Sequence, residues 1–120
     1  MKFSWTTLVV KDMAASLAFY EGFLGLEIQR RLPRDNGPEI VFLGKEDAMV
    51  ELIAGNPVEA TQPGAGISLG FTTGSLDAAI ALAGEKGLPL HSGPFQPNPH
   101  IRFFFVLDPD GYKIQIAENM

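Results

Sequence analysis

Apolar and polar positions follow two different rhythms near the start of the chain, and each rhythm predicts one kind of element. Phe3–Val10 is rich in β-branched and aromatic residues, which is typical of a strand. Apolar residues then recur at spacings of four, three and four: Met13, Leu17, Tyr20 and Leu24. These spacings predict an amphipathic helix with Asp12 as its N-cap and Gly25 just beyond its end.

Three further strands are predicted before the middle of the chain: Glu27–Leu32, Glu39–Leu43 and Ala48–Ile53. The loop Pro33–Pro38, which contains Asn-Gly, and the tight turn Gly44–Asp47 separate them. The segment Ala54–Gly66 contains prolines and glycines and is predicted to be a connector. The first half therefore has the order βαβββ.

The second half repeats this order. Its predicted strands are Ile67–Thr72, Leu88–His91, His100–Leu107 and Tyr112–Glu118. Its predicted helix carries apolar residues at helical spacing: Leu76, Ile80 and Ala83. Gly87 ends that helix, Ser92–Pro99 is a proline-rich loop, and Asp108–Gly111 favours a type I turn with a following bulge. We therefore predict an α+β fold of two tandem βαβββ modules, at about 1–58 and 64–120, within a single domain spanning 1–120.

Some of these strands are apolar at every position. Ile40–Leu43 and Phe103–Val106 do not alternate with polar residues, and a strand needs such a sequence only when both of its faces are covered. The predicted helices can cover one face. The other face then lines either a packed interior or an enclosed, largely apolar cavity, and the pattern leaves both open.

Composition excludes several function classes. The 120 residues contain no cysteine, which rules out thiol nucleophiles, disulfides and thiolate metal sites. The net charge is −5, and only Arg30, Arg31 and Arg34 cluster among nine basic residues, so nucleic-acid binding is not expected. No apolar run approaches the roughly 20 residues that span a membrane, and no secretion signal is recognisable. We expect a cytoplasmic protein.

Two segments resemble one known family. Val10–Tyr20, running into Leu24–Glu27, is similar to the first helix of the vicinal oxygen chelate superfamily, and Asp108–Ile114 resembles its C-terminal hairpin. This superfamily includes glyoxalase I, extradiol dioxygenases and bleomycin resistance proteins. The resemblance implies two βαβββ modules whose strands form a curled mixed sheet around a cleft. It also implies helices on the outer face and a homodimer.

Metal-binding members of the superfamily hold their ion with four ligands, on the first and last strand of each module. The resemblance places these positions at Trp5, Glu51, Ser68 and Gln115. Only Glu51 is a strong ligand, because tryptophan offers no lone pair and the serine and glutamine side chains are weak neutral donors. No metal and no other cofactor is therefore predicted. His91 and His100 are expected to be ordinary surface or rim residues.

Trp5 and Glu51 each have two interpretations. Trp5 is either a stacking platform for a flat ligand or a filler of the former metal site. Glu51 is either a catalytic general base or a carboxylate satisfied by Gln115, Ser68 or Arg102.

Two further candidate ligand-binding residues lie on the long strand before the last hairpin. Counting through the turn puts Arg102 and Phe104 on the face of Gln115, unless a bulge reverses the register. Arg102 then binds an anionic group or pairs with Glu51; otherwise it is a strand-end arginine in solvent.

The family resemblance, taken together with these residues, implies two possible functions. The first is a metal-independent protein that binds a small aromatic or amphipathic molecule in an apolar cleft, as bleomycin resistance proteins do. The alternative is an enzyme, a glyoxalase I-like (lactoylglutathione lyase-like) lyase or isomerase that uses Glu51 as base or a metal site completed by a partner subunit.

Overall fold

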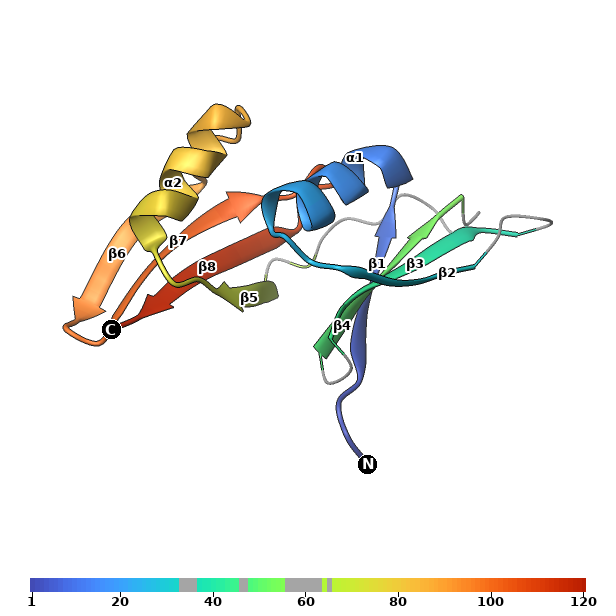
Figure 1. Cartoon of the computed structure of the whole chain (residues 1–120), viewed down its shortest axis with the longest axis horizontal. Helices are drawn as coiled ribbons and strands as arrows, with labels where there is room; N and C mark the ends of the chain where they lie inside the picture. The colour runs from blue at the N-terminus through green and yellow to red at the C-terminus, as the bar shows by residue number, and fades with distance from the viewer. Residues whose placement is uncertain (33–36, 46–47, 56–63, 65) are drawn as a thin grey trace. The chain divides into compact units, whose positions relative to one another are not determined.

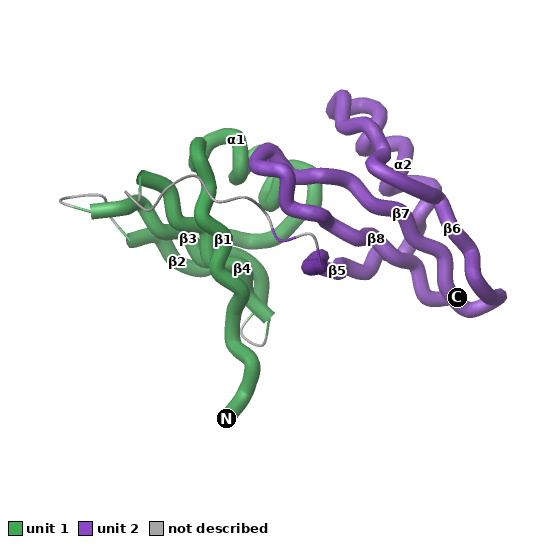
Figure 2. Tube along the Cα trace, turned by 180° about the vertical axis from the view of Figure 1, so that it is seen from behind, with its two compact units in different colours: residues 1–62 green, residues 63–120 purple. Residues whose placement is uncertain are grey.

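The computed structural model describes residues 1–32, 37–45, 48–55, 64 and 66–120. The chain divides into two compact units, residues 1–62 and 63–120 (Figure 2). Both have the element order βαβββ, so the predicted α+β class and its internal repeat are confirmed. That the two modules form one domain stays a prediction. Within the described ranges, no helix is long and apolar enough to cross a membrane.

The first unit contains one four-stranded sheet and a two-part helix (Figure 1). Its elements are β1 (Trp5–Val10), α1 (Met13–Leu17), η1 (Ala18–Phe23), β2 (Ile28–Leu32), β3 (Glu39–Lys45) and β4 (Ala48–Ala54). The strand order is β1-β4-β3-β2. β1 runs parallel to β4, and the other neighbours are antiparallel.

The helix begins and ends where its sequence predicts. The Asp12 carboxylate accepts a hydrogen bond from the Ala14 N–H at 3.0 Å, which caps the first turn. Gly25, with φ of 74°, follows the last turn in the left-handed region that glycine adopts without strain. Between them α1 continues into η1, a π-helical segment that the apolar spacing did not predict.

One face of the first sheet is covered. Alternate residues of β4, such as Val50 and Leu52, are buried, and so are Val41 and Leu43 of β3. The helical segment contributes its own buried residues to this core: Met13, Phe19, Tyr20 and Phe23. The opposite sheet face carries Trp5, Phe42 and Glu51 among others, and we call it the open face of the first unit.

The second unit repeats this topology. Its elements are β5 (Ser68–Thr72), α2 (Leu76–Glu85), β6 (Ser92–Asn98), β7 (Ile101–Leu107) and β8 (Lys113–Asn119). The strand order is β5-β8-β7-β6, with β5 parallel to β8.

The predicted strand Leu88–His91 is wrong, and its predicted neighbouring loop is the strand instead. β6 spans Ser92–Asn98 and pairs with β7 through two register irregularities. Proline normally excludes a segment from a central strand because it lacks an N–H. β6 lies at the edge of its sheet, where prolines are tolerated.

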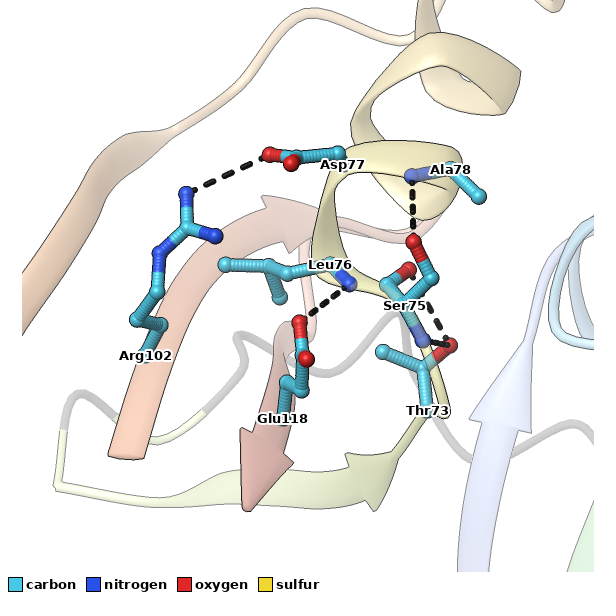
Figure 3. A network of polar contacts seen from close by, with 7 residues as sticks. All are labelled: Thr73, Ser75, Leu76, Asp77, Ala78, Arg102 and Glu118. Carbon is cyan, nitrogen blue, oxygen red and sulfur yellow. Dashed lines mark hydrogen bonds and ion pairs between the residues drawn. The ribbon is translucent and has the colours of Figure 1, made fainter. Parts of the chain in front are cut away.

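The N-terminus of α2 is fixed to its sheet by polar side chains (Figure 3). The Ser75 hydroxyl accepts from the Ala78 N–H at 3.1 Å. The Glu118 carboxylate on β8 accepts from the Leu76 N–H at 2.8 Å. A carboxylate at a helix N-terminus also interacts favourably with the helix dipole. The side of the sheet that carries Glu118 is therefore the side that α2 covers.

Candidate functional site

Strand register brings several chemically distinct side chains together on the open face of the first unit. Trp5 of β1 lies opposite Met49 of β4, and Thr7 lies opposite Glu51. Glu51 in turn lies opposite Phe42 of β3. Because paired residues on neighbouring strands project from the same side of a sheet, these five side chains form one patch.

Phe42 lies at the centre of an aromatic and cationic group. The Trp5 ring meets it edge-on, with ring centroids 5.5 Å apart and an interplanar angle of 82°. The Arg30 guanidinium carbon lies 5.1 Å from the Phe42 ring centroid, a cation–π distance. Phe42 is only 6% exposed, whereas Trp5 is 49% exposed. Trp5 and Arg30 thus present their outer surfaces to a molecule approaching from solvent.

These side chains border a pocket of about 260 Å³. Its lining residues are Trp5, Gln29, Arg30, Phe42 and Met49. A bulge in β2 between Ile28 and Arg30 allows two consecutive residues, Gln29 and Arg30, to reach the same pocket. The Gln29 side-chain amide donates to the Gly44 carbonyl at 2.6 Å, which holds this part of the wall in place.

Glu51 is oriented by its neighbour on β1. The Thr7 hydroxyl donates a hydrogen bond to Glu51 Oε1 at 2.5 Å. The predicted partner Arg102 instead forms an ion pair with Asp77 at 3.3 Å. Contacts of Glu51 with Ser68 or Gln115, which belong to the other unit, stay predictions.

The sheet face of the second unit that points away from α2, which we call the open face of the second unit, also carries a row of aromatic rings. The Phe95 and Phe103 centroids are 5.5 Å apart, and those of Phe103 and Phe105 are 5.7 Å apart. Lys113 Nζ lies 4.4 Å from the Phe105 centroid. Gln115 pairs with Phe105 and therefore projects from this face.

β5, the counterpart of β1 in the second unit, carries smaller side chains on this face. Ser68 lies at the exposed start of β5, opposite Lys113. Gly70 pairs with Gln115, and a Cβ at Gly70 would lie 3.8 Å from Gln115 Oε1. The second unit therefore has small residues on β5 where β1 of the first unit carries Trp5 and Thr7.

A family model described as the Glyoxalase/Bleomycin resistance protein/Dioxygenase superfamily matches residues 2–116. The chain belongs to this superfamily. It is 30% identical over 130 residues to the lactoylglutathione lyase of Haemophilus influenzae, with 99% of this chain and 93% of that protein covered.

Two solved structures show the superfamily fold at lower identity. Glyoxalase I of Leishmania major, described as trypanothione-dependent, has a TM-score of 0.82 at 21% identity and covers 98% of this chain and 86% of its own. TnmS3, an antibiotic binding protein from a Streptomyces species, has a TM-score of 0.76 at 21% identity and covers 100% and 97%.

The donor set of this glyoxalase-superfamily member does not fit a divalent ion. Trp5 cannot ligate a metal, and the Trp5 ring packs on Phe42. Glu51 alone offers a charged oxygen at the four positions that the family resemblance implies. Among the described residues, no group of three His, Asp or Glu side chains is placed to hold a metal. His91 and His100 are exposed residues of the second unit.

The prediction that Arg102 and Phe104 lie on the same sheet face as Gln115 is wrong. Arg102 pairs with Glu118 and Phe104 pairs with Ile116, so both lie on the face covered by α2, opposite to Gln115. Figure 3 shows Arg102 directed toward Asp77 at the start of α2. The cause is the hairpin turn, in which Gly111 has φ of 90° and forms a bulge that adds one residue. The predicted strand bounds put Tyr112 opposite Leu107. In the structure Lys113 lies opposite Leu107, so the pairing is shifted by one residue.

Sequence reasoning missed Phe42, Gln29, Arg30 and Met49 as site residues. Phe42 belongs to a strand that is apolar at every position, so its sequence carries no sign of which face is open. Gln29 reaches the pocket through a bulge, which has no signature in a single sequence. Met49 could have been found, because it neighbours Trp5 once β1 is paired in parallel with β4.

Proposed function

We propose that this superfamily member is a metal-independent binding protein for a small planar aromatic molecule, which lies against Trp5 in the pocket of the first unit. The observation that carries the proposal is the Trp5–Phe42–Arg30 group at a position where metal-binding relatives need a ligand. An antibiotic-binding relative of the same fold supports a binding role.

The physical argument rests on what each side chain offers. A half-exposed indole provides a large rigid surface at low entropic cost, and aromatic pairs contribute about 0.5–1.5 kcal/mol beyond their buried area. Met49 adds a polarizable, adaptable wall. The volume of about 260 Å³ lies just below the roughly 300–1,000 Å³ of pockets that take drug-sized ligands. A ligand of one or two rings fits this size.

The single tryptophan provides a direct measurement. In ¹⁵N-labelled protein, the one indole N–H signal belongs to Trp5. We expect titration with 2-naphthamide or 2-naphthoate to shift this signal saturably. Trp5→Leu should weaken binding, measured by calorimetry, about three- to tenfold because the stacking surface is lost.

Phe95→Leu is the matched control, because Phe95 is a similarly exposed aromatic residue (45%) in the other unit. It should leave the affinity unchanged. Binding of neither probe, or equal losses in the Trp5 and Phe95 variants, would show that the pocket is not the binding site.

The alternative is lyase chemistry with Glu51 as base, and the 30% identity to lactoylglutathione lyase favours it. Elemental analysis of the purified protein, followed by a lactoylglutathione lyase assay with added Ni²⁺, Zn²⁺ or Mn²⁺, separates the two functions. Turnover that is lost in Glu51→Gln would establish the enzyme and refute the binding-only function. We expect neither stoichiometric metal nor turnover.

A further inference from the structure

We propose that the pocket selects planar aromatic ligands that carry an anionic group, a carboxylate or a sulfonate, and that Arg30 is the residue that reads this charge. This inference rests on the proposed binding function and adds the chemical class of the ligand. The observation behind it is the charge of Arg30 at the pocket wall, unpaired among the described residues, and not the arrangement of the aromatic rings.

Arg30 is held in position without being neutralised. Its guanidinium lies over the Phe42 ring, and β2 places it on the pocket wall directly opposite Phe42. Within the part of the chain that the structure describes, no carboxylate forms an ion pair with it. A guanidinium carries five N–H donors in a planar fork, and this fork matches the geometry of a carboxylate or sulfonate.

Arg102 on β7 shows the contrast. Arg102 has Asp77 as its partner, so its charge is already matched. On the first unit, the nearest carboxylate in the same cross-strand row is Glu51, which lies beyond Phe42 on the next strand. Two strand spacings amount to roughly 10 Å, and Glu51 Oε1 accepts from Thr7 on the far side.

This arrangement also orients the ligand. Across the strands, the cation of Arg30 lies on one side of Phe42 and the carboxylate of Glu51 lies on the other. An anionic substituent is attracted toward Arg30 and repelled from Glu51, while the rings lie against the pocket walls formed by Trp5 and Met49. The overall net charge of −5 works against anions, so a preference for an anion would have to arise locally.

The test compares two probes that differ in charge and little else. At low salt, 2-naphthoate should bind about three- to tenfold more tightly than 2-naphthamide, as measured by calorimetry. The carboxylate gains one contact with the charge of Arg30, near the protein surface, which the amide lacks. The difference should shrink as salt is raised, since exposed charges are screened.

Two variants on the same strand locate the effect. Arg30→Gln should abolish the preference, so that within this variant the dissociation constants of 2-naphthoate and 2-naphthamide become equal, whatever the variant does to the affinity for 2-naphthamide itself. Arg31→Gln makes the same charge change on the opposite face of β2, where Arg31 pairs with the buried Val41, and should keep the preference. Equal binding of both probes, or equal effects of the two variants, would overturn the inference while leaving the binding function intact. Binding of neither probe would instead refute the binding function itself.

Discussion

At the scale of single residues, one extra turn residue decides what β7 presents to each side. The strand Ile101–Leu107 is almost entirely apolar, so its sequence does not distinguish its two faces. The bulge at Gly111 sets the register that sends Phe104 into the core and Phe103 to the open face. An error of one residue in the predicted register of a hairpin therefore exchanges a core residue with a candidate ligand contact.

Alanine substitutions at these neighbours test this assignment. Phe104 is 0% exposed, so Phe104→Ala should lower the free energy of unfolding by about 3–5 kcal/mol through cavity formation. Phe103→Ala removes a half-buried ring and should cost only about 1–2 kcal/mol. Urea denaturation of both variants measures the difference. Equal costs would contradict the observed register.

At the element scale, one glycine allows two neighbouring strands to approach each other closely. Gly44 in β3 has φ of 109°, and a Cβ there would lie 3.0 Å from the Ala48 carbonyl oxygen. A residue without a Cβ is therefore favoured where the end of β3 approaches the start of β4. The same glycine's carbonyl accepts the Gln29 amide, so the hairpin and the pocket wall depend on one backbone segment.

Gly→Ala substitutions at two sites should therefore change the free energy of unfolding in opposite directions. Gly44→Ala should destabilise the protein by about 1–3 kcal/mol because it combines a strained φ with a backbone clash. Gly84→Ala, in the exposed part of α2 with nothing within 4 Å of its Cβ position, should stabilise by about 0.5–1 kcal/mol. Thermal and urea unfolding check both. A neutral or stabilising Gly44→Ala would show that the hairpin tolerates a side chain there.

Elements with strong local signals were predictable, and those set by their surroundings were not. The Asp12 cap and Gly25 terminator locate the first helix because each acts through its own backbone. The edge strand β6 was missed because its prolines argue against a strand, and only its position at the sheet edge makes them acceptable. The β2 bulge, which builds the pocket wall, is likewise a property of the pairing.

At the scale of the whole molecule, the repeat and the family were predictable, whereas the site was predictable only in part. Element order alone gave the two βαβββ modules, since it does not depend on side-chain contacts. Trp5 was proposed from the family motifs, and its neighbours Phe42 and Arg30 could be identified only from the sheet register. The four positions that the family resemblance implies belong to different units, with Trp5 and Glu51 in the first and Ser68 and Gln115 in the second.

Restoring the missing ligands tests whether those four positions form one site. The triple variant Trp5→His, Ser68→His, Gln115→Glu would combine two imidazoles with two carboxylates, a donor set that suits Zn²⁺ or Ni²⁺. One ion bound per chain, measured by calorimetry and elemental analysis, would show that the four positions can act as one site. Whether or not metal binds, 2-naphthamide should bind about three- to tenfold more weakly because the Trp5 ring is lost. Adding Glu51→Gln removes the one native ligand and should weaken metal binding strongly. A triple variant that folds, judged by circular dichroism, and binds no metal would show that the two units do not bring these positions together.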